Sequence, residues 1–298
     1  MGNSGFLNKL ITPKDTTVFD RTLDILIALL PAAIAGCVYF GMHALLMLLC
    51  CMVSAVVAAF LSAKLLGVRE DVRDLSALVC GLLIAMTMPS GFSIPAAMVC
   101  TVAAVIVARV MFGGNGCEIV SPVAFGAVLC FLCFPGLFYY NEAFTNLPTQ
   151  ITSGFTLRQL IFGAHAGAIG ETPAVFLLLG ALYLCLRRVI SPVLPVFAVA
   201  FTALFSFLFG VDVLTAILGG GVLLAAIFIL PDRNLAPSGF MGQIAYSAAF
   251  ALLTVIIRRY AAVEEGVYFA ALTVNLIRPL FEAIPEIKKK GEKPYEKA

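Results

Sequence analysis

The sequence predicts an all-α, polytopic membrane protein with about ten transmembrane helices. Of the 298 residues, 61% are hydrophobic and 12% are charged, and the mean hydropathy is +1.04. Soluble domains contain about 25% charged residues, so this chain cannot hide its apolar surface by folding in water. Its apolar residues also gather in runs of bilayer-spanning length, and short turns rich in glycine and proline separate these runs.

The apolar runs form two sets of five. The first set is expected near residues 22–40, 44–66, 75–88, 94–112 and 120–138. The second set is expected near residues 173–186, 192–209, 214–230, 242–257 and 266–284. The third and sixth runs are short for a membrane span.

Lys and Arg residues predict the orientation. If the N-terminus is cytoplasmic, most of them fall on the cytoplasmic side, and outside the spans only Arg158, Arg258 and Arg259 fall on the other. Cytoplasmic loops carry such an excess. We therefore expect both termini in the cytoplasm and the long polar stretch at 151–172 facing outward.

The two sets of runs look like a duplication. The third run, from Gly81 to Pro89, is similar to the eighth, from Gly221 to Pro231, and each is followed by a Ser-Gly-Phe sequence. Five spans per copy place the copies in opposite senses, which is the inverted-repeat architecture of many transporters. The expected organisation is a cytoplasmic segment at 1–21, a first repeat at 22–140, an outward-facing loop at 141–172, a second repeat at 173–284 and a basic cytoplasmic tail at 285–298.

Ionisable and strongly polar residues inside the predicted spans are few, and in membranes such residues often mark a functional path. Asp24 opens the first span, and Asn275, Arg278 and Glu282 share one face of the tenth because of their i, i+3 and i+4 spacing. These four residues are candidates for an ion or charge path. A structural alternative is that Arg278 and Glu282 only pair with each other.

The nine cysteines predict no metal site. Cys130 and Cys133 form a CxxC sequence, but it lies in an apolar run without the second pair of ligands that metal sites use. We interpret the buried cysteines as small hydrophobic residues.

Four stretches resemble the membrane protein family that contains the B subunit of the sodium-pumping NADH:quinone oxidoreductase and the D subunit of the Rnf complex. They are the Ile11-Thr12-Pro13 start with 23–31, the Gly113-Gly114 turn with Ser121-Pro122, the Gly170-Glu171-Thr172 entry with 177–184, and 242–246 with 266–280. They occur in the family's order over nearly the whole chain. The length of the chain favours the Rnf-type member.

This resemblance implies a covalently bound FMN. In the family, the FMN phosphate is esterified to the threonine that closes a Ser/Thr-Gly-Ala-Thr motif, and here Ser153, Gly154 and Thr156 match it, with Phe155 in place of alanine. Arg158 lies close enough in sequence to meet the phosphate charge. The resemblance also leaves room for a second, noncovalent flavin.

The function that the resemblance implies is electron transfer in a complex that translocates Na⁺ or H⁺. Such a chain is not catalytic alone. It would lie in the bacterial inner (plasma) membrane with other membrane and flavoprotein subunits, and nucleic acid is not an expected partner. The alternative is a stand-alone inverted-repeat channel or transporter for a small solute.

Overall fold

The computed structural model describes residues 17–67, 74–138, 167–171, 174–261 and 265–283. Within these residues the chain is helical, and its only β-type pairing is an isolated bridge between Pro89 and Ala168. The prediction of an all-α polytopic fold is confirmed. Four of the described helical runs are long and apolar enough to span a membrane, namely residues 18–40, 42–66, 94–112 and 240–261.

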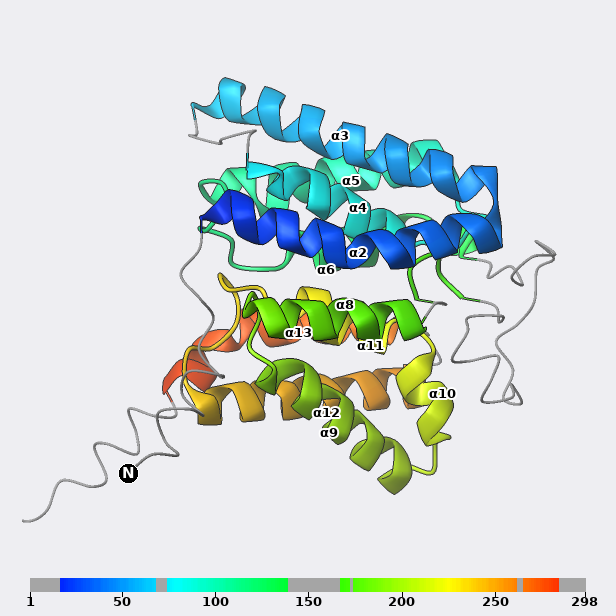
Figure 1. The fold of residues 1–298 in the computed structure, drawn as a ribbon, viewed down its shortest axis with the longest axis vertical. Helices are drawn as coiled ribbons and strands as arrows, with labels where there is room; N and C mark the ends of the chain where they lie inside the picture. Colours follow the sequence, from blue (N-terminus) through cyan, green and yellow to red (C-terminus); the bar gives the residue numbers. More distant parts are fainter. Residues whose placement is uncertain (1–16, 68–73, 139–166, 172–173, 262–264, 284–298) are drawn as a thin grey trace, which may run out of the picture.

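The first half contains five α-helices, which lie together above the second half in Figure 1. They are α2 (Val18–Phe40), α3 (Met42–Leu66), α4 (Ser76–Met86), α5 (Ile94–Ala108) and α6 (Pro122–Cys133), with the 3₁₀ turns η2 (Val110–Phe112) and η3 (Pro135–Leu137). Thr17 caps α2 by accepting from the Asp20 amide at 3.2 Å. Ser121 caps α6 in the same way, and Pro122 occupies its first turn.

The second half follows the same order with one broken member. It contains α8 (Ala174–Arg187), α9 (Val193–Leu208), α10 (Val213–Leu218), α11 (Val222–Leu224), the π-helix η4 (Ala225–Ile229), α12 (Phe240–Ala261) and α13 (Gly266–Leu276). The eighth span, expected to be one helix over 214–230, is therefore broken at Gly219–Gly221. Gly220 and Gly221 have φ of 62° and 76°, a left-handed backbone that favours glycine.

Two other boundaries differ from the sequence prediction. In the tenth span, expected to be one helix over 266–284, α13 ends at Leu276, and a turn at Ile277 precedes a further helical stretch at 278–283. The fifth span ends as an α-helix at Cys133, where Phe134 leaves helical geometry just before Pro135. A residue before proline is disfavoured in the α conformation, so the helix stops there.

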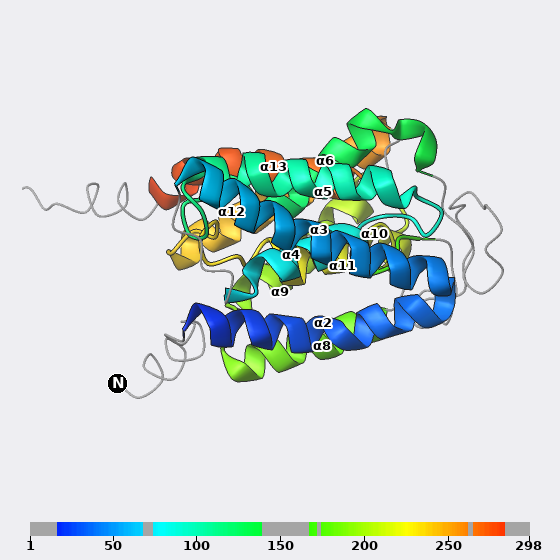
Figure 2. The same cartoon turned by 90° about the horizontal axis from the view of Figure 1, so that it is seen from above.

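The same helix pairings occur in both halves. In the first half α3 packs against α4 and α5, and in the second half α9 packs against α10 and α12. Between the halves, the two first helices pack together, α2 on α8, and so do the two last helices, α6 and α13. Figure 2, seen from above, places α2 over α8 along one side of the molecule. A duplicated chain predicts this pattern.

Two short segments lie at the centre. Almost every residue of α4 is buried, and so is nearly every residue from Val222 to Ile229. A helix that is apolar on all sides is expected in the interior. The long helices surround these segments and keep large apolar side chains exposed, for example Ile34 and Val38 on α2 and Val53 and Val57 on α3. Outward apolar surface on this scale suits a lipid environment.

Candidate functional site

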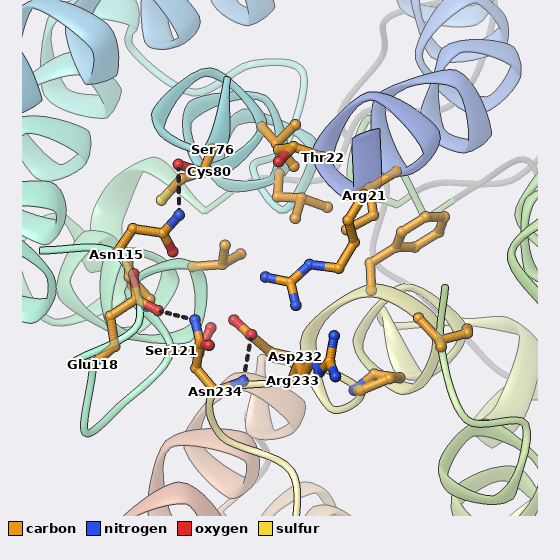
Figure 3. A pocket seen from close by; sticks show the side chains of 18 of the residues that line it. Arg21, Thr22, Ser76, Cys80, Asn115, Glu118, Ser121, Asp232, Arg233 and Asn234 are labelled. Atoms are coloured by element: carbon orange, nitrogen blue, oxygen red, sulfur yellow. Dashed lines mark hydrogen bonds between the residues drawn. The ribbon is translucent and has the colours of Figure 1, made fainter. Parts of the chain in front are cut away.

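A polar pocket lies between the two halves at the end of the molecule where α2 begins (Figure 3). Its volume is about 870 Å³, counting the part open to solvent. Arg21, Arg109 and Arg233 line it, and we call it the arginine pocket. Further lining comes from the start of α4, the 110–123 segment, the end of η4 and the following turn.

Arg109 forms the buried side of this pocket. It is 3% exposed, and its Nη2 donates to the Ser76 hydroxyl at 2.6 Å. Its Nε lies 3.9 Å from Oε1 of Glu118, which is also buried. Asn115 donates to the same Ser76 hydroxyl at 3.3 Å. A buried charge of this kind requires a partner and hydrogen bonds, and the first half supplies both.

The second half closes the pocket with the turn after η4. The Asn234 side-chain amide donates to Glu118 at 3.4 Å, and the Asn234 backbone amide donates to Asp232 at 3.1 Å (Figure 3). Desolvation raises the pKa of the Asp232 carboxyl, while the Asn234 hydrogen bond and the guanidinium groups of Arg21, Arg109 and Arg278 act in the opposite direction. The pocket thus combines cations, carboxylates and neutral amide donors next to apolar walls.

Such a lining can hold a flat, polar ring system or an anionic group. Ligand pockets are mostly apolar, with a few convergent polar groups that fix the orientation of the ligand. Here Leu83, Val123 and Phe228 supply apolar wall, while Asn115 and Asn234 can donate and accept. Among the described residues, no group of three or more His, Cys, Asp or Glu side chains could hold a metal ion.

Asp24 lies at the seam between α2 and α8. Its carboxylate is 3.1 Å from Nη2 of Arg187 and accepts from the Tyr183 hydroxyl at 2.8 Å. Asp24 is buried, whereas the Arg187 side chain is 58% exposed. This predicted path residue therefore joins the two halves through an ion pair.

The other three predicted path residues lie around the end of α13. Arg278 pairs with Glu282 at 2.7 Å and also donates to the backbone carbonyl of Asn234, which is the pairing that the structural alternative predicts. The carbonyl of buried Asn275 accepts from the Tyr246 hydroxyl, and its amide nitrogen is buried without a hydrogen-bond partner. None of these contacts involves Asp24.

The predicted flavin residues Ser153, Gly154, Thr156 and Arg158 lie outside the described residues. Cys130 and Cys133 do not face the same way, because Cys130 is buried and Cys133 is exposed. All nine cysteines are free thiols.

Sequence reasoning missed the arginine pocket. In the sequence, Arg21, Arg109 and Arg233 count only toward orientation, and Pro231 to Asn234 looks like a plain turn. The 113–122 segment contributes only its resemblance to a family motif. Recognising the pocket requires knowing that the end of η4 packs beside the start of α4, which lies far away in the sequence.

The fold and the pocket define a class: a polytopic α-helical membrane protein built from two similar halves, with a charged binding pocket between them. The chain matches the NQR2, RnfD, RnfE family over residues 11–291 and belongs to that family.

Several similar proteins are D subunits of named complexes. The chain is 32% identical over 276 residues to that of the Na(+)-translocating ferredoxin:NAD(+) oxidoreductase complex of Acetobacterium woodii, covering 87% of this chain and 86% of that one. It is 26% identical to that of the proton-translocating ferredoxin:NAD(+) oxidoreductase complex of Clostridium ljungdahlii, with 93% of each chain covered. It is 27% identical to that of the ion-translocating oxidoreductase complex of Halorhodospira halophila, with 87% of each chain covered.

Proposed function

We propose that this chain is the flavin-carrying membrane subunit of a bacterial ion-translocating electron-transport complex. The observation that carries the proposal is the family match over residues 11–291, together with relatives that are named as the D subunits of such complexes. Because these relatives are parts of complexes, the chain is part of a translocase and works beside other membrane and flavoprotein subunits. The coupling ion is Na⁺ or H⁺.

The covalent flavin is assigned to Thr156. FMN, when bound, supplies one- and two-electron transfer. The hydroxyl of Thr156 would form the phosphoester, Gly154 would let the backbone turn at that point, and Ser153 and Arg158 would meet the phosphate charge. Family resemblance and the polar character of the stretch support this assignment. The direct test is flavin fluorescence that stays on the chain in a denaturing gel.

A second, noncovalent flavin would bind in the arginine pocket. The volume of the pocket lies within the range of small-molecule sites. Asn115 and Asn234 can pair with the donor and acceptor edge of the ring, and the three arginines would stabilise the negative charge that a reduced ring carries. The proposal is supported by this set of side chains and by the family resemblance.

Replacing Asn115 tests the second site. We expect Asn115→Leu to lower the flavin that heat or acid releases from the purified complex by one equivalent, because a donor to the ring is lost. The covalently held flavin should stay unchanged. Arg259→Gln, an exposed residue on α12, is the control and should change neither. An unchanged amount of released flavin in Asn115→Leu would contradict this placement.

The proposed location is the bacterial inner membrane with both termini in the cytoplasm. In that orientation the arginine pocket faces the cytoplasm, as an excess of cytoplasmic arginine predicts. A cysteine introduced at Gln150 should react with an impermeant thiol reagent added outside intact cells or spheroplasts. A cysteine introduced at Glu292 should react only after permeabilisation, and the reverse pattern would reject the orientation.

A stand-alone channel or transporter is the competing function. The family membership favours the electron-transfer role, because the similar proteins are named as parts of oxidoreductase complexes. The purified chain, reconstituted alone in liposomes, separates the two functions. Solute flux without electron transfer or partner subunits would favour the channel.

A further inference from the structure

A short buried segment connects the two halves at the level of the broken helix. Residues 167–171, which we call the strap, are all buried. The strap amides of Ile169 and Gly170 donate to the carbonyls of Met88 and Met86 at 3.1 and 2.9 Å. The last carbonyls of a helix lack partners within it, so the strap satisfies the free end of α4.

The strap is also fixed against α2. A Cβ atom at Gly36 would overlap the backbone carbonyl of Ile169, so only glycine allows this close approach. A Cβ atom at Gly170 would lie 2.5 Å from Cβ of Met86. Hydrogen bonds and steric contact therefore hold the strap to the first half.

Glu171, the last residue of the strap, reaches into the second half. It is 3% exposed and accepts from the Tyr268 hydroxyl of α13 at 2.8 Å. A Cβ atom at Gly221 would overlap its carboxylate, so Glu171 lies directly against the start of the helical stretch 222–229. A negative charge is favourable at a helix N-terminus, where the macrodipole is positive.

Arg258 of α12 holds the other side of the break. Its guanidinium donates to the carbonyls of Ala216 at 3.0 Å and Gly219 at 3.5 Å, and also to that of Gly220. These carbonyls form the C-terminal end of α10, where a cation is favourable. Arg258, Glu171 and Glu265 all contribute to the electrostatic environment of the Tyr268 hydroxyl. The break therefore has a cation at the end of one short helix and a carboxylate at the start of the next.

We propose that the strap is a mechanical link between the outer loop and the broken helix, with Glu171 as its positioning residue. Residues 139–166 lead directly into the strap, so a displacement of the loop that pulls on Glu171 is transmitted to α10 and α11. The link rests on the proposed function only for what the loop carries. With flavin at Thr156, it connects the electron carrier to the helix that is interrupted at Gly219–Gly221.

Hydrogen–deuterium exchange of the purified complex tests the link in both directions. Arg258→Gln removes the guanidinium contacts to the end of α10. We expect it to speed exchange of the strap amides by about tenfold, because two coupled sites share one opening equilibrium. Reciprocally, Glu171→Gln should speed exchange in residues 219–224. Arg259→Gln, the exposed neighbour on the same helix turn, is the matched control and should leave both segments protected.

Several outcomes overturn the proposal. Unchanged strap exchange in an assembled Arg258→Gln complex would do so, and so would a rise spread equally over α3 and α5. If Arg258→Gln fails to assemble, Glu171→Gln and then Tyr268→Phe, which removes only a hydroxyl, give the same measurement at 219–224. Coupled exchange in a chain that carries no flavin would support the link and reject the proposed function. Flavin on Thr156 without coupled exchange would do the opposite.

Discussion

Thr156→Val is expected to abolish covalent flavin on this chain. A phosphoester needs a hydroxyl oxygen, and valine has nearly the shape of threonine without that oxygen. The purified, denatured chain should lose its fluorescence, and the mass of FMN less water should be missing from the peptide that contains residue 156. Thr156→Ser keeps a hydroxyl and is the matched control, which should retain part of the attachment.

Neighbouring hydroxyls make this experiment specific. Thr152 and Ser153 lie within a few residues of Thr156, so the added mass on either of them would shift the site within the loop. Phe155 stands where the family has a small alanine, and Phe155→Ala should keep or raise the extent of attachment. A chain without any flavin-bearing peptide, isolated from a host with an active transferase, would contradict the covalent assignment.

Arg109→Leu is expected to produce the largest loss of stability among the pocket variants. Arg109 and Glu118 are 3% and 8% exposed. Removing one partner of a buried ion pair leaves an uncompensated charge and costs about 3–5 kcal/mol. That is a large part of a typical folding free energy of about 5–15 kcal/mol. The yield of intact complex and its thermal unfolding midpoint should both fall.

Two further variants identify the cause. Arg233→Leu removes a guanidinium from the same pocket, but Arg233 is exposed, so its unfolding midpoint should stay close to that of the parent. Arg109→Leu combined with Glu118→Leu removes both charges and should recover part of the loss, which a double-mutant cycle measures. Equal stability of Arg109→Leu and Arg233→Leu would show that the buried pair contributes little.

The sequence predicts the helices well because lipid and interior both favour apolar runs of definite length. It fails where a helix is interrupted by tertiary contacts. The Gly219–Gly221 break is held by Arg258 and Glu171, which come from distant parts of the chain, and no local pattern reveals them. The end of α13 at Leu276 is similar: Ile277 is apolar, and the turn there comes with the contact of Arg278 to Asn234.

The candidate sites show the same division. Intramembrane charge identifies Asp24, Asn275, Arg278 and Glu282, but their hydrogen bonds and ion pairs show local pairing in two separate places. The arginine pocket could not be predicted because each residue that forms it has an ordinary alternative role, as a loop arginine or a turn asparagine. Only the packing of the two halves brings them together.

The packing of α2 on α8 and of α6 on α13 has an evolutionary consequence. Contacts between equivalent elements are isologous, as in a symmetric homodimer, so the two halves are arranged like two protomers joined into one chain. In a true homodimer, each copy would have to carry both members of every such pair. Here Asp24 stands on one helix and Arg187 with Tyr183 on the other. This ion pair therefore belongs to the time after fusion, and it makes the two halves non-interchangeable.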